Sequence, residues 1–143
     1  MNTLKIRFLI FYLVFNLVVS CKNKSDKISE KWYGDYYFII NEDHDDWRDQ
    51  QKISLKITKD SILYHAEGYQ IDQTYRLSGK ESDDFLKLDY LSTEDDTESA
   101  VLKKTKNFGT ITNSNKFYTW SSPYVDLSFG EGKSKIYTLT KNN

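Results

Sequence analysis

Apolar and polar residues alternate along most of the chain after position 32. Apolar side chains occupy every second position of segments 53–57 and 86–90, with polar residues between them. Alternation with a period of two predicts a β-strand that buries one face. Segment 36–40 is apolar or aromatic at every position, which is typical of a strand covered on both faces. The predicted strands are 36–40, 53–57, 61–66, 72–78, 86–90, 108–112, 116–121, 125–129 and 135–140.

Short polar clusters, most of them containing Gly, Asn, Asp or Ser, separate these segments. The predicted turns are 59–60, 67–68, 78–80, 113–115 and 130–133. Short strands joined by such turns predict an antiparallel meander. A meander of this length closes into a small barrel or folds into a sandwich, because both arrangements hide the edge strands. We therefore expect a mainly β fold of about eight strands, forming a single domain over residues 32–143.

Segment 92–106 is compatible with two structures. Its acidic residues come first and its basic residues last, and Ser92 stands three residues before Asp95, the spacing of a helix capping box. A short helix is one interpretation. The other is an acidic loop that leads into the next strand, and we favour the loop.

The first 20 residues have the composition of a secretory signal. Lys5 and Arg7 precede an apolar run over residues 8–19 that only Asn16 interrupts. This run is too short for a membrane-spanning helix, which needs roughly 20 apolar residues, and it matches the apolar region of a signal peptide. We predict that residues 1–20 are a signal peptide that is cleaved from the mature protein.

The apolar run ends in the sequence Val18-Val19-Ser20-Cys21. This sequence resembles the lipobox of bacterial lipoproteins, in which an aliphatic residue and a small residue come before an obligatory cysteine. The resemblance implies that Cys21 is acylated and anchors the mature protein in a membrane. Residues 21–31 would then be the acylated N-terminus and a flexible tether. Lys22 stands where an aspartate favours inner-membrane retention in Gram-negative bacteria, so the resemblance points to the outer membrane.

Charge and composition narrow the range of partners. The chain has 143 residues and a formal net charge of −1, which becomes −3 if Lys5 and Arg7 leave with the signal. A mildly acidic surface is unsuited to a phosphate backbone, so we exclude nucleic acid as a partner. The 11 Tyr, 8 Phe and 3 Trp favour strands. Cys21 is the single cysteine, which excludes an intrachain disulfide.

The first predicted strand is preceded by Trp32-Tyr33-Gly34. This motif resembles the start of lipocalin-like barrels, where an indole closes one barrel end and a glycine allows backbones to approach closely. The order here is Trp-x-Gly, whereas the lipocalin signature has Gly-x-Trp. The aromatic segments 108–111 and 117–118 resemble a hairpin that is common in such small barrels. The resemblance implies the barrel architecture and no particular ligand.

The chain has few residues that could carry out catalysis. Its one thiol is assigned to the lipid, and His44 and His65, the only histidines, lie in no hydrolase or metalloprotease motif. Residues 41–46 offer oxygen ligands for Ca²⁺ but lack the glycine and the distant glutamate of a calcium loop. We therefore interpret them as a solvated hairpin loop. We predict a protein that is not an enzyme and that uses no cofactor and no metal.

Two acidic clusters are the candidate contacts for a protein partner, because acidic loops at a barrel rim would steer a basic protein. Small lipid-anchored β-domains of the kind that this chain resembles include inhibitors of lysozyme-like enzymes and immunity proteins. The hypothesis is a non-enzymatic protein of that type, which occludes a secreted enzyme or toxin. The candidate contact residues are Asp43, His44, Asp45, Asp46, Glu94, Asp95 and Asp96.

Two alternatives remain open at this stage. One is a lipocalin-like carrier of a small apolar ligand, and the other is a structural accessory of the cell envelope. A carrier needs an empty interior. Bulky residues at positions 53, 55, 57, 86, 88, 125 and 127 predict a filled interior, which counts against a carrier.

Overall fold

Eight antiparallel strands follow one another along the residues that the computed structural model describes, 27–115 and 117–142. The predicted signal and Cys21 lie outside the described residues. One helix, α2 (Pro123–Phe129), separates the last two strands. The strands are β1 (Gly34–Ile40), β2 (Gln51–Ile57), β3 (Ile62–Gly68), β4 (Ile71–Glu81), β5 (Phe85–Thr93), β6 (Asn107–Ser114), β7 (Phe117–Ser121) and β8 (Ile136–Asn142).

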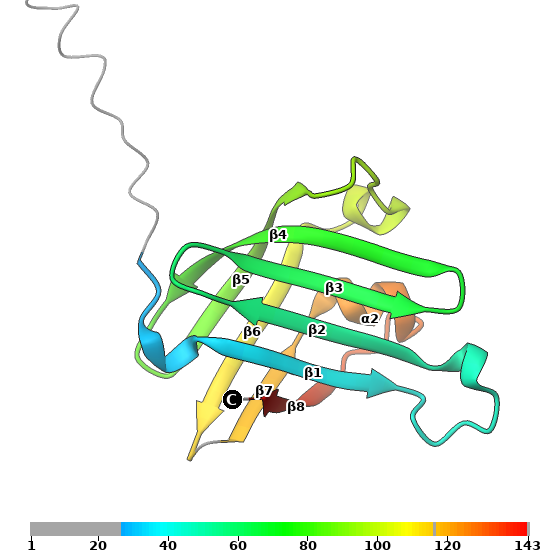
Figure 1. Ribbon diagram of the computed structural model, residues 1–143, viewed down its shortest axis with the longest axis horizontal. Helices are drawn as coiled ribbons and strands as arrows, with labels where there is room; N and C mark the ends of the chain where they lie inside the picture. The colour runs from blue at the N-terminus through cyan, green and yellow to red at the C-terminus, as the bar shows by residue number, and fades with distance from the viewer. Residues whose placement is uncertain (1–26, 116, 143) are drawn as a thin grey trace, which may run out of the picture.

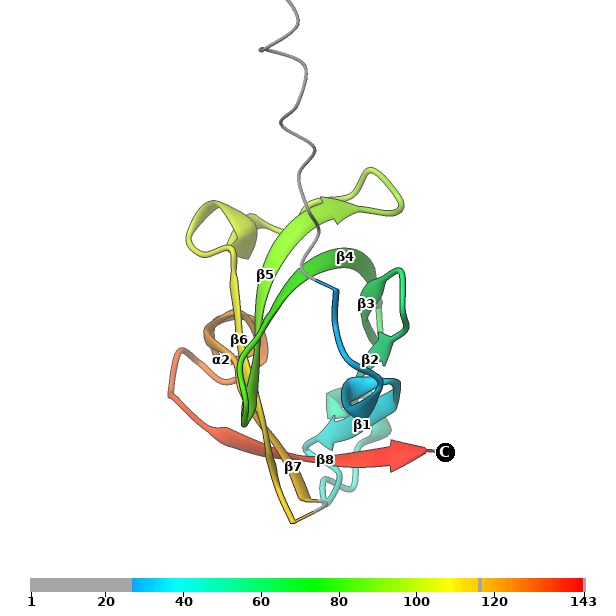
Figure 2. The ribbon, with the colours of Figure 1, turned by 90° about the vertical axis from the view of Figure 1, so that its left-hand side faces the viewer.

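The sheet closes on itself. Each strand pairs with its neighbours in the sequence, and β1 also pairs with β8, with Tyr37 opposite Thr140. The strands cross the molecule in Figure 1 and surround a common interior in Figure 2. This arrangement confirms the predicted mainly β meander and shows that it forms a barrel rather than a sandwich. Among the eight described strands, closure leaves no edge open to another chain.

Inward and outward positions alternate as the sequence pattern predicted. Ile53, Leu55 and Ile57 of β2 are buried, whereas Lys52 and Lys56 are exposed. Much of the interior is aromatic, and its rings are in contact. The buried aromatic residues are Trp32, Tyr36, Tyr64, Tyr75, Phe108, Trp120 and Tyr124. The barrel interior is therefore filled by side chains, as in other small barrels. Among the described residues, the buried core extends from Trp32 to Leu139.

A short 3₁₀ turn, Glu30–Trp32, covers the end of the barrel at which β1 begins. The Trp32 ring is fully buried and packs edge-on against Tyr118, with ring centroids 6.3 Å apart. The Tyr36 hydroxyl donates to the Trp32 carbonyl at 2.8 Å. Gly34 has a φ of 145°, and a Cβ there would lie 2.6 Å from Lys141 Cε. The Trp-x-Gly motif thus combines a buried indole with a glycine against which the Lys141 side chain packs.

One predicted strand is wrong. Segment 125–129 lies in α2, which buries Tyr124, Val125 and Asp126 and leaves Leu127 exposed. The Ser122 hydroxyl accepts a hydrogen bond from the Val125 N–H at 3.3 Å, and proline occupies the first turn of the helix. Serine at the N-cap followed by proline is a start signal for a helix. The alternation of apolar residues over five positions was too short to distinguish a strand from a helix.

The predicted turn at residues 78–80 is also wrong, because these residues continue β4. A Cβ at Gly79 would lie 2.7 Å from Ile62 Cδ1 and 2.9 Å from Ile28 Cδ1. The glycine therefore serves close packing inside a strand and not a turn. The chain turns after Glu81, at residues 82–84.

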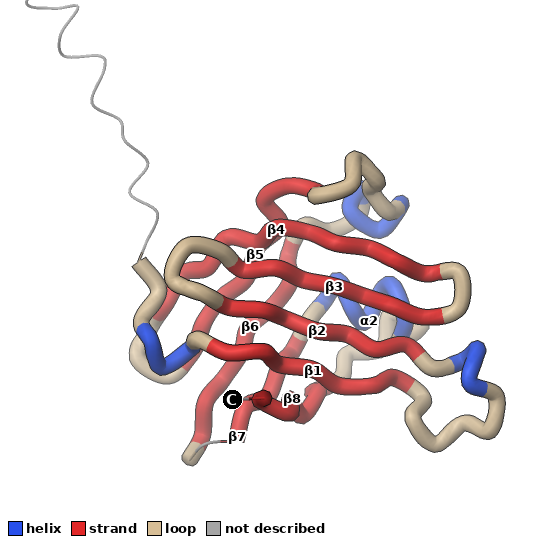
Figure 3. Tube along the Cα trace, in the orientation of Figure 1, coloured by secondary structure: helices blue, strands red, loops and turns tan. Residues whose placement is uncertain are grey.

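Segment 92–106 has the loop structure that we favoured. Strand β5 continues to Thr93, and a single 3₁₀ turn, Ala100–Lys103, precedes β6. Figure 3 shows this short turn projecting beyond the strands. Acidic residues at the start of a segment and basic residues at its end did not suffice to form an α-helix.

Candidate functional site

The four connections that follow odd-numbered strands emerge at one end of the barrel, which we call the loop end. They are residues 41–50, 69–70, 94–106 and 122–135. The opposite end, which we call the N-terminal end, carries the Glu30–Trp32 turn and the connections that follow even-numbered strands. In Figure 1 the loop end is on the right and the N-terminal end on the left. Both predicted acidic clusters therefore lie at the loop end, on different hairpins.

The first acidic loop, residues 41–50, is held by its own side chains. Arg48 Nε donates to Asp46 Oδ1 at 2.9 Å, and this pairing holds the pKa of the Asp46 carboxyl below its ordinary value. His44 Nδ1 lies 3.4 Å from Asp49 Oδ2. Asp43 and Asp45 are exposed and make no ion pair with another described residue. The loop thus uses Asp46 for its structure and presents Asp43 and Asp45 to solvent.

The second acidic loop follows β5 and is held by contacts with β4 and within the loop. Glu94 Oε1 accepts from Arg76 Nε at 2.8 Å. Asp95 Oδ1 accepts from the hydroxyl of Thr93 at 2.7 Å, and hydrogen bonds to this carboxylate lower its pKa. Asp96 has a φ of 59° and is exposed. Of the three candidate contacts in this loop, Asp96 is therefore the one whose carboxylate no described residue binds. No ion pair joins the two acidic loops within residues 27–115 and 117–142.

An exposed aromatic pair at the loop end was not predicted. The side chains of Trp47 and Tyr69 are 66% and 47% exposed, and their ring centroids lie 5.7 Å apart in an edge-to-face arrangement. Trp47 directly follows the first acidic run, and Tyr69 lies in the tight turn between β3 and β4. The pair joins two neighbouring hairpins. We call Trp47 and Tyr69 the aromatic pair.

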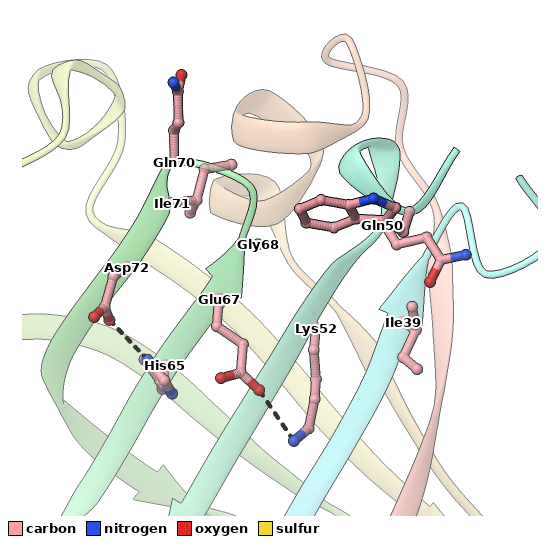
Figure 4. Close-up of a pocket in the computed structure, with 10 residues that line it drawn as sticks. Ile39, Gln50, Lys52, His65, Glu67, Gly68, Gln70, Ile71 and Asp72 are labelled. Atoms are coloured by element: carbon pink, nitrogen blue, oxygen red, sulfur yellow. Dashed lines mark hydrogen bonds and ion pairs between the residues drawn. The ribbon is translucent and has the colours of Figure 1, made fainter. Parts of the chain in front are cut away.

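A shallow depression of about 860 Å³ lies beside the aromatic pair, on the outer face of strands β1 to β4. The register aligns Ile39, Lys52, Glu67 and Asp72 in one row across these strands. Lys52 Nζ lies 3.1 Å from Glu67 Oε1, and His65 Nε2 lies 2.9 Å from Asp72 Oδ1 (Figure 4). Lys52, Glu67, His65 and Asp72, the ionisable side chains of the depression, thus contact one another in two pairs. Trp47, Gln50, Gly68, Gln70 and Ile71 complete its lining.

Ser54, His65 and Asp72 come together on this outer face, a set of residue types that can form a hydrolase triad. Ser54 lies opposite His65 in the register, and Asp72 binds the imidazole. The Ser54 hydroxyl, however, donates to the His65 backbone carbonyl at 3.4 Å. A triad requires the hydroxyl to donate to the imidazole ring, so these three residues are not arranged for nucleophilic catalysis.

A cluster of hydroxyl groups closes the interior at the loop end. The Tyr124 hydroxyl of α2 lies 2.8 Å from Ser99 Oγ and 3.2 Å from Gln73 Oε1. The Tyr75 hydroxyl accepts from the Ser99 N–H at 3.2 Å. Burial raises the pKa of the Tyr124 hydroxyl, which stays protonated at neutral pH. These contacts attach α2 and the segment before β6 to β4, so the cluster has a structural role.

The structure therefore assigns different roles to the predicted contact residues. Asp43, Asp45 and Asp96 make no ion pair with another described residue. His44, Asp46 and Asp95 bind within their own loops, and Glu94 binds Arg76 of β4. Within the described part of the chain, no three His, Cys, Asp or Glu side chains are placed to hold a metal ion. No helix among the same residues has the length and apolarity to cross a membrane.

Comparisons with protein-family models, with curated proteins and with solved structures find no match to this chain.

Proposed function

We propose that this chain is a lipid-anchored envelope protein that binds a basic protein partner through the loop end of its barrel. It blocks that partner by occlusion, without catalysis, as an inhibitor or an immunity protein does. The observation that carries this proposal is the exposed aromatic pair, Trp47 and Tyr69, beside the unpaired carboxylates of the first acidic loop.

The aromatic pair has the properties of an interface anchor. Tryptophan and tyrosine supply most of the residues that dominate binding energy in protein interfaces, because they bury a large area with few rotatable bonds. Each ring of the pair restricts the other through an edge-to-face contact. Less conformational entropy is therefore lost when a partner covers the two rings.

The charges around the aromatic pair indicate that the partner's surface is positively charged. Asp43 and Asp45 are exposed next to Trp47 and have no cation bound to them among the described residues. Unpaired carboxylates around an aromatic anchor attract a basic surface and accelerate the encounter. A partner that carries Lys or Arg around an apolar recess therefore fits the loop end.

The proposed anchor gives the loop end its orientation. If Cys21 carries the lipid, the chain enters the barrel at the N-terminal end, where the Glu30–Trp32 turn lies. The loop end is at the opposite side of the molecule (Figure 1). The aromatic pair would then face away from the membrane, where a soluble enzyme or toxin can reach it.

The filled interior counts against the alternative of a lipocalin-like carrier. Phe108 and Tyr124 stack inside the barrel with centroids 4.2 Å apart, and Tyr64 lies edge-on to Phe108 at 5.1 Å. A ligand would have to displace several buried rings from the core. A protein partner at the outer rim requires no such rearrangement.

The proposed function is tested by affinity capture. The chain from residue 21 onward, with Cys21→Ser, is immobilised and exposed to envelope and culture extracts at low salt. We expect stoichiometric capture of a basic protein that Trp47→Ala with Tyr69→Ala abolishes. Phe117→Ala is the matched control, because this side chain is 72% exposed at the N-terminal end. Capture that depends on Phe117 and not on the aromatic pair would refute the site, and absence of any captured protein would refute the function.

The anchor is tested separately in growing cells. We expect the full chain to incorporate labelled palmitate and to fractionate with the outer membrane. Cys21→Ala should abolish the label. A labelled Cys21→Ala chain, or an unlabelled and secreted parent chain, would contradict lipid attachment at this residue.

A further inference from the structure

A notch opens at the N-terminal end of the barrel because two paired strands differ in length. The pairing of β3 with β4 ends at Ile62 opposite Leu77, whereas β4 continues to Glu81. Residues 78–81 of β4 therefore have no partner from β3. The segment around Ile28 and the turn between β2 and β3 border this gap and enclose a depression of about 910 Å³.

The rim of the notch is cationic. Lys27, Lys59 and Lys80 line it from three different segments of the chain, and none of the three makes an ion pair with another described residue. The other charged groups of the lining are Arg76, Asp60 and Asp89. Arg76 is bound to Glu94, and Asp89 lies 3.5 Å from Lys87 Nζ. Within residues 27–115 and 117–142, the lining of the notch thus holds three unpaired ammonium groups and one unpaired carboxylate, that of Asp60.

The wall of the notch is apolar. Ile28, Ile62 and Leu77 line it, and Leu91 stands on its border with 59% of its surface exposed. Leu91 is the extra residue of a β-bulge, because the register shifts between Arg76 and Leu77. A bulge redirects the side chain that it inserts. The notch therefore combines phosphate-binding groups with an exposed apolar side chain.

The position of the notch follows from the proposed anchor at Cys21, on which this inference rests. Lys27 is the sixth residue after Cys21. Six residues span at most about 20 Å even when the chain is fully extended. A lipid on Cys21 would therefore keep Lys27, and with it the notch, close to the headgroup layer of the membrane.

We propose that the notch docks on the membrane that holds the anchor and binds the phosphate of an anionic phospholipid headgroup. Lys27, Lys59 and Lys80 contact the phosphate, and Leu91 reaches towards the acyl chains. Each basic residue near an anionic leaflet raises the membrane partition constant by a factor of about five. Docking at this end fixes the barrel with its loop end pointing away from the bilayer, instead of leaving it to rotate on a tether.

Vesicle cosedimentation tests the notch with the chain from residue 21 onward carrying Cys21→Ser, which retains the complete barrel. Vesicles of phosphatidylcholine are compared with vesicles that contain about one-third phosphatidylglycerol. We expect binding to the anionic vesicles alone, weakened by salt. Lys59→Gln with Lys80→Gln should lower the partition constant by roughly tenfold or more. Lys103→Gln with Lys104→Gln removes the same charge at the loop end and should leave binding unchanged.

One further variant and one competition measurement separate a lipid from a free anion. Leu91→Ser should weaken vesicle binding, and inorganic phosphate at millimolar concentration should not displace the parent chain from vesicles. Equal losses in the two lysine pairs would show a general charge effect and overturn the site. Displacement by inorganic phosphate would show that the notch binds free phosphate and not a lipid headgroup, and it would overturn docking on the membrane. Neither result affects palmitate labelling or partner capture, so failure of the notch is distinguishable from failure of the proposed function.

Discussion

Ser29 and Glu81 are joined by two hydrogen bonds that attach the segment before the first strand to the end of β4. The Ser29 N–H donates to Glu81 Oε2 at 2.8 Å, and the Ser29 hydroxyl donates to Oε1 at 2.6 Å. Lys31 Nζ lies 3.0 Å from the same Oε1. This contact fixes the Glu30–Trp32 turn, which places the Trp32 indole in the end of the barrel.

The Ser29–Glu81 contact predicts a dependence of stability on pH. Burial alone would raise the pKa of Glu81, but the hydrogen bonds from Ser29 and Lys31 outweigh it and lower this pKa to about 2. Because the pKa is lower in the folded chain than in the unfolded chain, the unfolded state binds more protons between about pH 4.5 and pH 2. The stabilisation is therefore complete above this window and is lost as the pH falls through it.

The measurement is urea unfolding of the parent chain and of Glu81→Gln at several pH values. At pH 7 we expect the variant to be less stable by roughly 1–2 kcal/mol, as for a charged hydrogen bond that is partly open to solvent. The difference should shrink below pH 4.5. Glu131→Gln, at an exposed pair with Lys133, is the control and should have little effect at any pH. A constant difference down to pH 2 would contradict the assigned pKa.

Gly109 predicts a severe effect of adding one methyl group. Its φ is 89°, and a Cβ at this position would lie 1.7 Å from the Ser121 carbonyl oxygen on the neighbouring strand. Backbone atoms of a paired strand cannot move aside without breaking the ladder. We expect Gly109→Ala to cost at least roughly 3 kcal/mol or to prevent folding. Gly132→Ala is the matched control.

Gly132 also has a positive φ, of 74°, but the nearest heavy atom to its Cβ would be 3.6 Å away. Gly132→Ala should therefore cost about 1 kcal/mol, the strain of the backbone conformation alone. Chemical denaturation of both variants separates the steric contribution from the conformational one. Equal losses at the two positions would show that the contact with Ser121 is not the cause.

Much of the strand pattern was predictable from the sequence, because strands such as β2 bury one face and show a period of two over five residues. Segment 36–40 showed no such period, and its outer positions Tyr37 and Ile39 are only partly buried. The predicted turn at 67–68 lies at the end of β3, and the chain turns at 69–70 instead.

The wrong strand at 125–129 and the wrong turn at 78–80 occur where apolar residues obey a different constraint. Gly79 allows Ile28 and Ile62 to approach β4 closely. The sequence Ser-Gly-Lys at residues 78–80 has the composition of a turn, although it lies inside the strand. In α2 the stronger signal was the pair Ser122 and Pro123, which identifies the start of a helix whatever the spacing of the apolar residues.

The candidate site was only partly predictable for a different reason. In a meander, connections that follow odd-numbered strands share one end, so the common location of Asp45 and Asp96 follows from strand order alone. Which carboxylates remain free depends on cations such as Arg48, whose pairing requires the fold of the loop. The contact of Trp47 with Tyr69 requires the register of two hairpins. Periodicity along one strand contains no information on that register.

A buried hydroxyl without a partner yields a third prediction. The Tyr64 side chain is fully buried, and its hydroxyl has no hydrogen-bond partner among the described residues. Removing an unsatisfied polar atom from a core costs little or stabilises the fold. We expect Tyr64→Phe to change the free energy of unfolding by less than about 0.5 kcal/mol or to increase it. Tyr124→Phe removes the hydrogen bond to Ser99 and should cost about 1 kcal/mol. A larger loss for Tyr64→Phe in thermal or urea unfolding would contradict this assignment.

The three tryptophans provide an optical probe of the proposed binding end. Trp47 is 66% exposed, whereas Trp32 and Trp120 are fully buried. Acrylamide should therefore quench the emission of Trp47 and leave that of the two core residues almost unchanged. Trp47→Phe should remove the quenchable part of the emission and change stability by no more than about 0.5 kcal/mol, as for other exposed positions. A captured partner that covers the loop end should protect Trp47 from quenching in the parent chain. Quenching that stays unchanged in the complex would place the partner elsewhere on the barrel and separate the exposed aromatic pair from binding.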